Sequence, residues 1–183
     1  MDNHTEIRQS YLGGFSILVL ESFFWLLAGI LWNYISFKTG ILVIIVSGTF
    51  FYPLSQLLQI ILKRPKVRKE NPLNLLFTQI SLIIPFSFPL IFMLTKENVN
   101  LFFPALTVII GAHYLPFVYA YKMNIYWILA SLLVICGSIF GFVLPDNMSN
   151  CAYYTGGILF LFAILNYYLI KKEISAKYSS SLL

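Results

Sequence analysis

Two ionisable side chains stand inside long apolar stretches of the sequence, and they are the first candidates for chemistry. Glu21 is the only formally charged residue within any such stretch, and His113 lies within another. A central acidic group in hydrocarbon costs about 2.5–3.5 kcal/mol on insertion scales, so it needs a buried partner or water. We therefore expect both side chains to face the protein interior.

The positions of these two groups along their stretches predict a common depth. At about 1.5 Å of rise per helical residue, Glu21 lies about 15 Å and His113 about 13 Å from the ends of their stretches that adjoin the more basic loops. The same count places Gln56 and Gln79 at about 10 Å and Asn166 at about 6 Å. We predict a polar pocket that opens to the cytoplasm and is sealed by apolar residues on the opposite side.

A carboxyl and an imidazole in one pocket could relay a proton or bind a cationic or amine-bearing ligand. The leading hypothesis is therefore a transporter or ligand-binding protein for a small polar or cationic solute, with possible coupling to protons. Neutral amides would add donors and acceptors, and tyrosines would form aromatic walls. The candidate ligand or proton-binding residues are Glu21, His113, Gln56, Gln79, Tyr52 and Tyr114.

Two other classes of function stay open. A membrane carboxyl or imidazole can simply hydrogen-bond a neighbouring helix, as in a structural or interaction subunit without catalytic activity. A membrane-embedded enzyme is the third hypothesis, although the sequence has no HExxH zinc pair and no GxSxG nucleophile turn. We therefore predict no catalytic residue, no metal site and no cofactor.

The composition requires the elements that hold these residues to lie in a lipid bilayer. Of the 183 residues, 59% are hydrophobic and 10% are charged, too few charges to cover a water-soluble protein of this size. Because a helix needs roughly 20 apolar residues to cross a bilayer, we predict an all-α bundle of six transmembrane helices forming one integral membrane domain over residues 1–183. The predicted spans are 12–35, 40–62, 73–95, 99–121, 124–144 and 151–170.

The basic residues predict the orientation of this bundle. With both termini in the cytoplasm, ten of the 12 Lys and Arg residues fall on the cytoplasmic side, and only Lys38 and Lys96 fall outside. This distribution follows the rule that Lys- and Arg-rich loops stay inside. The net charge of +5 thus indicates membrane topology and contact with lipid, and not binding of nucleic acid.

The last two spans contain glycines and cysteines whose positions bear on helix packing. Gly137 and Gly141 stand four apart, a spacing that allows close helix packing inside the bundle or, less favoured, in a homo-oligomer. Cys136 lies near the middle of the fifth span and Cys151 begins the sixth at the outer surface. We therefore expect these cysteines to differ in depth by more than a disulfide can reach.

Several short motifs distributed along the chain resemble a family of small bacterial multi-pass membrane proteins. That family is known only as a domain of unknown function. The resemblance implies a bacterial cytoplasmic membrane, six spans and no established activity, and it supplies no catalytic or binding residues. The motifs are Glu21-Ser-Phe-Phe-Trp25, Tyr52-Pro-Leu-Ser55, Lys63-Arg-Pro65, Asn71-Pro-Leu73, and Gly111-Ala-His-Tyr-Leu-Pro-Phe117 followed by Tyr119 and Tyr121.

Overall fold

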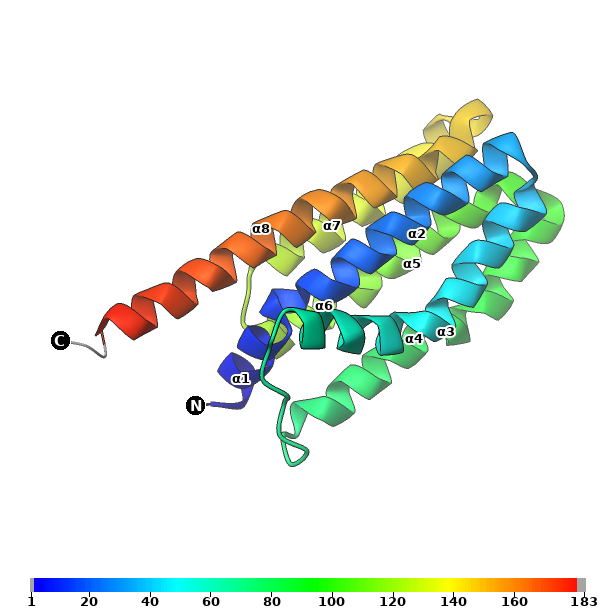
Figure 1. Cartoon of the computed structure of the whole chain (residues 1–183). Coiled ribbons are helices and arrows are strands. Elements are labelled where there is room, and N and C mark those ends of the chain that lie inside the picture. Colours follow the sequence, from blue (N-terminus) through cyan, green and yellow to red (C-terminus); the bar gives the residue numbers. More distant parts are fainter. Residues whose placement is uncertain (1, 181–183) are drawn as a thin grey trace.

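The computed structural model describes residues 2–180, and the side chains of residues 2–144 and 147–176, as an arrangement of helices without a strand (Figure 1). Eight α-helices are connected by loops and, in three places, by short 3₁₀ or π-helical segments. The α-helices are α1 (Asn3–Ser10), α2 (Phe15–Tyr34), α3 (Phe37–Ile61), α4 (Leu73–Glu97), α5 (Phe102–His113), α6 (Leu115–Tyr121), α7 (Ile125–Ser138) and α8 (Cys151–Ser180).

Six helical segments of the described chain are long and apolar enough to cross a membrane, which confirms the predicted number of spans. Their bounds differ from the predicted ones by a few residues at most ends, and α8 continues beyond the predicted end at residue 170. The six segments are Leu12–Tyr34, Phe37–Ile61, Leu73–Glu97, Val99–Tyr121, Ile125–Val143 and Asn147–Ala176.

Helix α2 lies between α3 and α8, and α5 packs along α7 (Figure 1). On α8 the fully buried residues recur every three or four positions, which is the spacing of one helix face. A Cβ added at Gly156 of that face would lie 2.8 Å from Leu26 of α2, so the two helices approach closely there. The buried residues of this face include Cys151, Ala152, Thr155, Leu159, Ala163 and Asn166.

Helices α3 and α4 are the least enclosed parts of the bundle. In their most apolar 18-residue windows, 17% of α3 and 11% of α4 is buried within the chain, against 44% for Leu12–Tyr34 and 50% for Val99–Tyr121. Helix α3 packs mainly on α2, and α4 packs mainly on α5. Most of the surface of α3 and α4 is therefore available to lipid.

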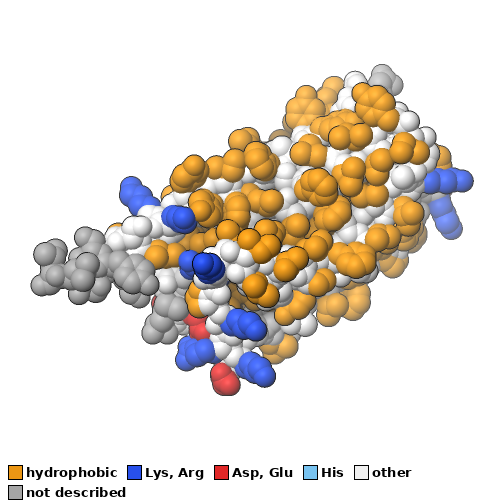
Figure 2. All heavy atoms as spheres, viewed as in Figure 1, with side chains coloured by type: hydrophobic (Ala, Val, Ile, Leu, Met, Phe, Trp, Pro, Cys, Tyr) orange, Lys and Arg blue, Asp and Glu red, His pale blue; other side chains and the backbone are white. Residues whose placement is uncertain are grey.

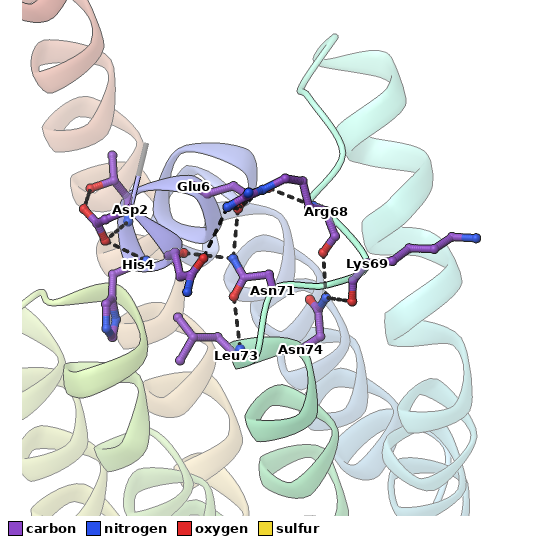
Figure 3. Close-up of polar contacts among 10 residues, drawn as sticks. Asp2, His4, Glu6, Arg68, Lys69, Asn71, Leu73 and Asn74 are labelled. Carbon is purple, nitrogen blue, oxygen red and sulfur yellow. Dashed lines mark hydrogen bonds and ion pairs between the residues drawn. The ribbon is translucent and has the colours of Figure 1, made fainter.

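The short N-terminal helix α1 fastens the loop between α3 and α4 to the bundle (Figure 3). The Glu6 carboxylate accepts hydrogen bonds from the backbone N–H of Arg68 at 2.7 Å, from Arg68 Nε at 3.0 Å and from Asn71 Nδ2 at 3.0 Å. These donors, the Arg68 side chain above all, lower the pKa of Glu6 to about 2. Arg64 also donates from Nη2 to the Gln9 carbonyl at 2.6 Å.

A tight turn between α1 and α2 depends on two glycines. Gly13 and Gly14 have φ values of 59° and 84°, in the left-handed region that glycine adopts without steric cost. The Gly13 carbonyl accepts hydrogen bonds from Tyr126 Oη at 2.6 Å and from Asn166 Nδ2 at 2.7 Å. The turn is thus joined to α7 through Tyr126 and to α8 through the amide nitrogen of Asn166.

The relation between the two cysteines corrects the expected difference in depth. The side chains of Cys136 and Cys151 are neighbours, and both thiols are free. The prediction was wrong because Cys151 is not at the outer surface: it is fully buried, 3.4 Å from Thr107 Oγ1. Gly137 contacts Pro104 and Val108, which flank Thr107 on α5, so the start of α8 lies at the level of Cys136.

Gly137 lies against α5 of the same chain. A Cβ at Gly137 would lie 2.6 Å from the Pro104 carbonyl oxygen, whereas a Cβ at Gly141 would make an ordinary contact at 3.5 Å. This position gives Gly137 a role in packing within the bundle. Contact between copies of the chain through these glycines stays a prediction.

The surface divides into an apolar middle and charged ends. Figure 2 shows hydrophobic side chains along the length of the bundle, and Lys and Arg side chains near its ends. Both chain termini lie at the end that also carries the loop between α3 and α4 (Figure 1). This end is called the basic end below, because ten of the 12 Lys and Arg residues belong to its segments.

Candidate ligand-binding site

The break in the fourth span positions two adjacent residues of the site. Helix α5 ends at His113, and α6 begins at Leu115 with Pro116 in its first turn. Proline has no N–H and its ring clashes with the carbonyl four residues earlier, here that of Ala112, so a continuous helix is disfavoured. His113 and Tyr114 therefore lie where the direction of the backbone changes.

Tyr114 holds the carboxyl group of Glu21. Its hydroxyl donates a hydrogen bond to Glu21 Oε2 at 2.5 Å, and both side chains are buried, at 2% and 4% exposure. The other carboxyl oxygen, Oε1, has no hydrogen-bond partner among the described residues. One oxygen of the carboxyl is thus fixed in position, and the other is available to a ligand.

Glu21 and His113 line the same cavity, which has a volume of about 420 Å³. Small-molecule sites in proteins typically have volumes of roughly 300–1,000 Å³. Five helices enclose the space: α2, α5 and α6 contribute its inner side, and α3 and α4 contribute its outer edge. The chief apolar and aromatic lining residues are Ile17, Trp25, Ile44, Phe51, Ile84, Phe88, Leu106, Ile110 and Phe117.

His113 lines this cavity and carries an unsatisfied ring nitrogen. The residue is 7% exposed, and Nδ1 is buried without a hydrogen-bond partner among the described residues. The ring also lies beside the backbone of Ile80 on α4 and edge-on to Phe117. Because a buried polar group without a partner is costly, this nitrogen is a candidate contact for a ligand.

The structure brings together four of the six candidates. Glu21, His113 and Tyr52 line the cavity, and Tyr114 reaches it through its hydrogen bond to Glu21. Neither Gln56 nor Gln79 is among the described residues that line it. Gln56 lies beside Tyr11, and Gln79 is exposed on the outer surface of α4.

The position of the opening also differs from the prediction. The cavity was expected to be polar and open at the cytoplasmic end, but its lining is largely apolar and its exposed residues belong to α3 and α4. At the basic end, Tyr11 stacks on Phe77 of α4 with ring centroids 5.7 Å apart and lies beside Gln56 of α3, so the N-terminal segment bridges the two helices there. A segment that the prediction left out thus covers this end.

Sequence reasoning did not identify the other polar residues of the cavity, Thr49 and Ser81. Each hydroxyl donates to a backbone carbonyl of its own helix, Thr49 to Val46 and Ser81 to Phe77. Hydroxyl residues are common in membrane helices, and only a helix-face argument with known neighbours would have selected these two. Among the described residues there is no group of three His, Cys, Asp or Glu side chains that could hold a metal ion.

Fold and site together define a polytopic helical protein with a cavity that contains a carboxyl group and an imidazole at the middle of its apolar helices. The chain belongs to the Family of unknown function (DUF7010), whose family model matches residues 2–169. This match confirms the resemblance seen in the sequence motifs. No curated protein and no solved structure gives a significant match.

Proposed function

We propose that the protein binds a small polar or cationic solute in the cavity, and that the recognised group is an amine. The observation that carries the proposal is the shared lining of one cavity by Glu21 and His113. An amine supplies N–H donors for the free Glu21 Oε1, and it can also exchange a hydrogen bond with His113 Nδ1. Aromatic residues around the carboxyl, Trp25 and Phe117 among them, would favour a cation further.

The role of Tyr114 in this proposal is to position the carboxyl group. Its hydroxyl keeps Glu21 Oε2 on the α5 side, so that Oε1 is presented to the cavity. A cation beside a carboxylate forms a neutral pair, which offsets part of the cost of either charge in a low-dielectric space. A neutral solute of the same shape lacks this contribution and should bind more weakly.

We extend the proposal to proton-coupled transport across a bacterial cytoplasmic membrane, with both termini inside. Two groups that can gain or lose a proton border the same space, and this supports coupling of ligand binding to proton movement. The concentration of Lys and Arg at the end with both termini supports the orientation.

Glu21→Gln tests the proposal, because the amide can still accept the Tyr114 hydrogen bond while its charge is lost. Phenethylamine at millimolar concentration is expected to raise the unfolding temperature of the full chain in detergent, and phenethyl alcohol is not. The shift should disappear in Glu21→Gln. In vesicles with an imposed pH gradient, uptake of phenethylamine through the wild-type chain should likewise be lost in the variant.

An equal shift of the unfolding temperature in wild type and Glu21→Gln would refute amine recognition at this site. Retention of the binding shift without any uptake would remove transport and leave a ligand-binding protein. The unfolding temperature of Glu21→Gln without ligand is the control for folding.

A further inference from the structure

The exposed edge of the cavity is a gap between α3 and α4 at the level of the apolar helix centres. Lining residues on α2 and α5 such as Glu21, Trp25 and Leu106 are buried, whereas Gly48 on α3 and Ser81 on α4 are exposed. A Cβ added at Gly48 would meet no atom within 4 Å, so the space beside this residue is open. The gap therefore faces the lipid-exposed side of the bundle.

Aromatic side chains close the cavity toward the basic end and toward the opposite end of the bundle. Toward the basic end, Phe117 stacks on Tyr126 and on Tyr121, and Phe77 packs against Phe117 with ring centroids 5.3 Å apart. Toward the opposite end, Trp25 packs on Phe103 at 5.7 Å between ring centroids. A solute in water would have to displace these rings, whereas a solute in the bilayer meets the gap directly.

We infer that the ligand enters the cavity sideways from the bilayer, between α3 and α4, and that it is a lipophilic amine that can lose its proton. The inference rests on the proposed recognition of an amine by Glu21. A molecule dissolved in lipid has an apolar body, and the walls beside the gap, which include Ile45, Ile84 and Phe88, match that body. The class is thus an amine with an alkyl or aromatic tail.

Charge conservation restricts the class further. A neutral amine beside a protonated carboxyl has the same net charge as an ammonium beside a carboxylate, and the two states differ only in which group holds one proton. The amine can therefore cross hydrocarbon neutral and form an ion pair only when it reaches Glu21. A quaternary ammonium carries its charge throughout and must bring it through the bilayer interior at high cost.

The test is the rate at which dodecylamine binds the full chain in phosphatidylcholine nanodiscs, followed by tryptophan fluorescence because Trp25 lines the cavity. Gly48→Leu fills the gap and is expected to slow association at least tenfold. Gly157→Leu is the matched control, because a Cβ at Gly157 also meets no atom within 4 Å but the residue lies on α8, away from the gap. Ser81→Phe obstructs the gap from the opposite helix and should act as Gly48→Leu does.

Dodecyltrimethylammonium should give no fluorescence change that depends on Glu21. If dodecylamine binds in a Glu21-dependent manner but equally fast to the wild type, Gly48→Leu, Ser81→Phe and Gly157→Leu, sideways entry is wrong and the proposed function stands. If dodecylamine binding is the same in Glu21→Gln, the proposed function itself is wrong. Glu21-dependent binding of dodecyltrimethylammonium at the rate of dodecylamine would overturn the requirement for a removable proton.

Discussion

Glu6 and Glu21 show how one residue type acquires two roles from its neighbours. Glu6 lies at the basic end and accepts hydrogen bonds from Arg68 and Asn71, which hold it as a carboxylate. Glu21 is bound by a single described hydroxyl, that of Tyr114. The first arrangement satisfies the carboxyl fully and serves stability, whereas the second leaves an oxygen for another molecule.

The lowered pKa of Glu6 makes the attachment of α1 sensitive to acid. Its value of about 2 lies below the ordinary 4.5, so the stabilisation is complete above pH 4.5 and is lost as the pH falls from there toward 2. Glu6→Gln should lower the free energy of unfolding at neutral pH by about 1–2 kcal/mol, because a neutral amide replaces a charged acceptor. Thermal unfolding in detergent between pH 7 and pH 2.5 measures the difference.

The difference in stability between wild type and Glu6→Gln should shrink over the acidic part of that range. A difference that stays constant across the whole range would contradict the assigned titration of Glu6. Lys66→Gln, a substitution in the same loop, controls for a general effect of changed charge.

The sequence predicted the depth of the site residues in the membrane, but it did not predict the direction in which each side chain points. Counting along each span placed Glu21 and His113 at one level, and the cavity does contain both. The same count included Gln56 and Gln79, but the structure directs Gln56 toward Tyr11 and leaves Gln79 exposed. The face of a helix that turns inward depends on its neighbours, and an almost uniformly apolar helix gives little periodic signal of that face.

At the scale of elements, the close contact of α5 with α7 depends on Gly137 and not on Gly141. Gly137→Ala should lower the free energy of unfolding by about 1–3 kcal/mol, because the added methyl group overlaps the Pro104 carbonyl and α7 must shift. Gly141→Ala is the matched control and should change stability little, since its Cβ has ordinary contact distance. Unfolding in a denaturing detergent series measures both variants.

Equal stability of the two alanine variants would show that α5 and α7 do not pack at Gly137 as described. A change in oligomeric state on Gly137→Ala, without a change in stability, would instead support the predicted contact between copies. Size-exclusion chromatography with light scattering separates these outcomes.

The long elements could be predicted well, since span length follows from bilayer thickness and runs of apolar residues. The break at Tyr114 follows from Pro116, which lies in the first turn of α6. Helix α1 could not be predicted from an apolar pattern because it is short and polar. Its stability depends on long-range partners such as Arg68, together with the Asp2 side chain, which accepts from the backbone N–H groups of His4 and Thr5.

At the scale of the whole molecule, the distribution of charge predicts which end faces the cytoplasm. In a bacterial host, green fluorescent protein fused after residue 183 should fluoresce, and alkaline phosphatase at that point should be inactive. Alkaline phosphatase fused after Asn98, between the third and fourth spans, should be active because it would be exported. The opposite pattern of activities would reverse the orientation and place the basic end outside.

The fastening of the Arg64 and Arg68 loop to α1 has a mechanical consequence for the paired outer helices. Gln9 and Glu6 hold the loop at the basic ends of α3 and α4, and at the opposite end a two-residue connection and the close approach of Gly40 to Ala28 hold α3 against α2. Since both ends of α3 are fixed, a separation of α3 from α4 would be widest midway along α3, near Gly48. A tail that is bulky near the bilayer centre would then fit better than one that is bulky near either surface.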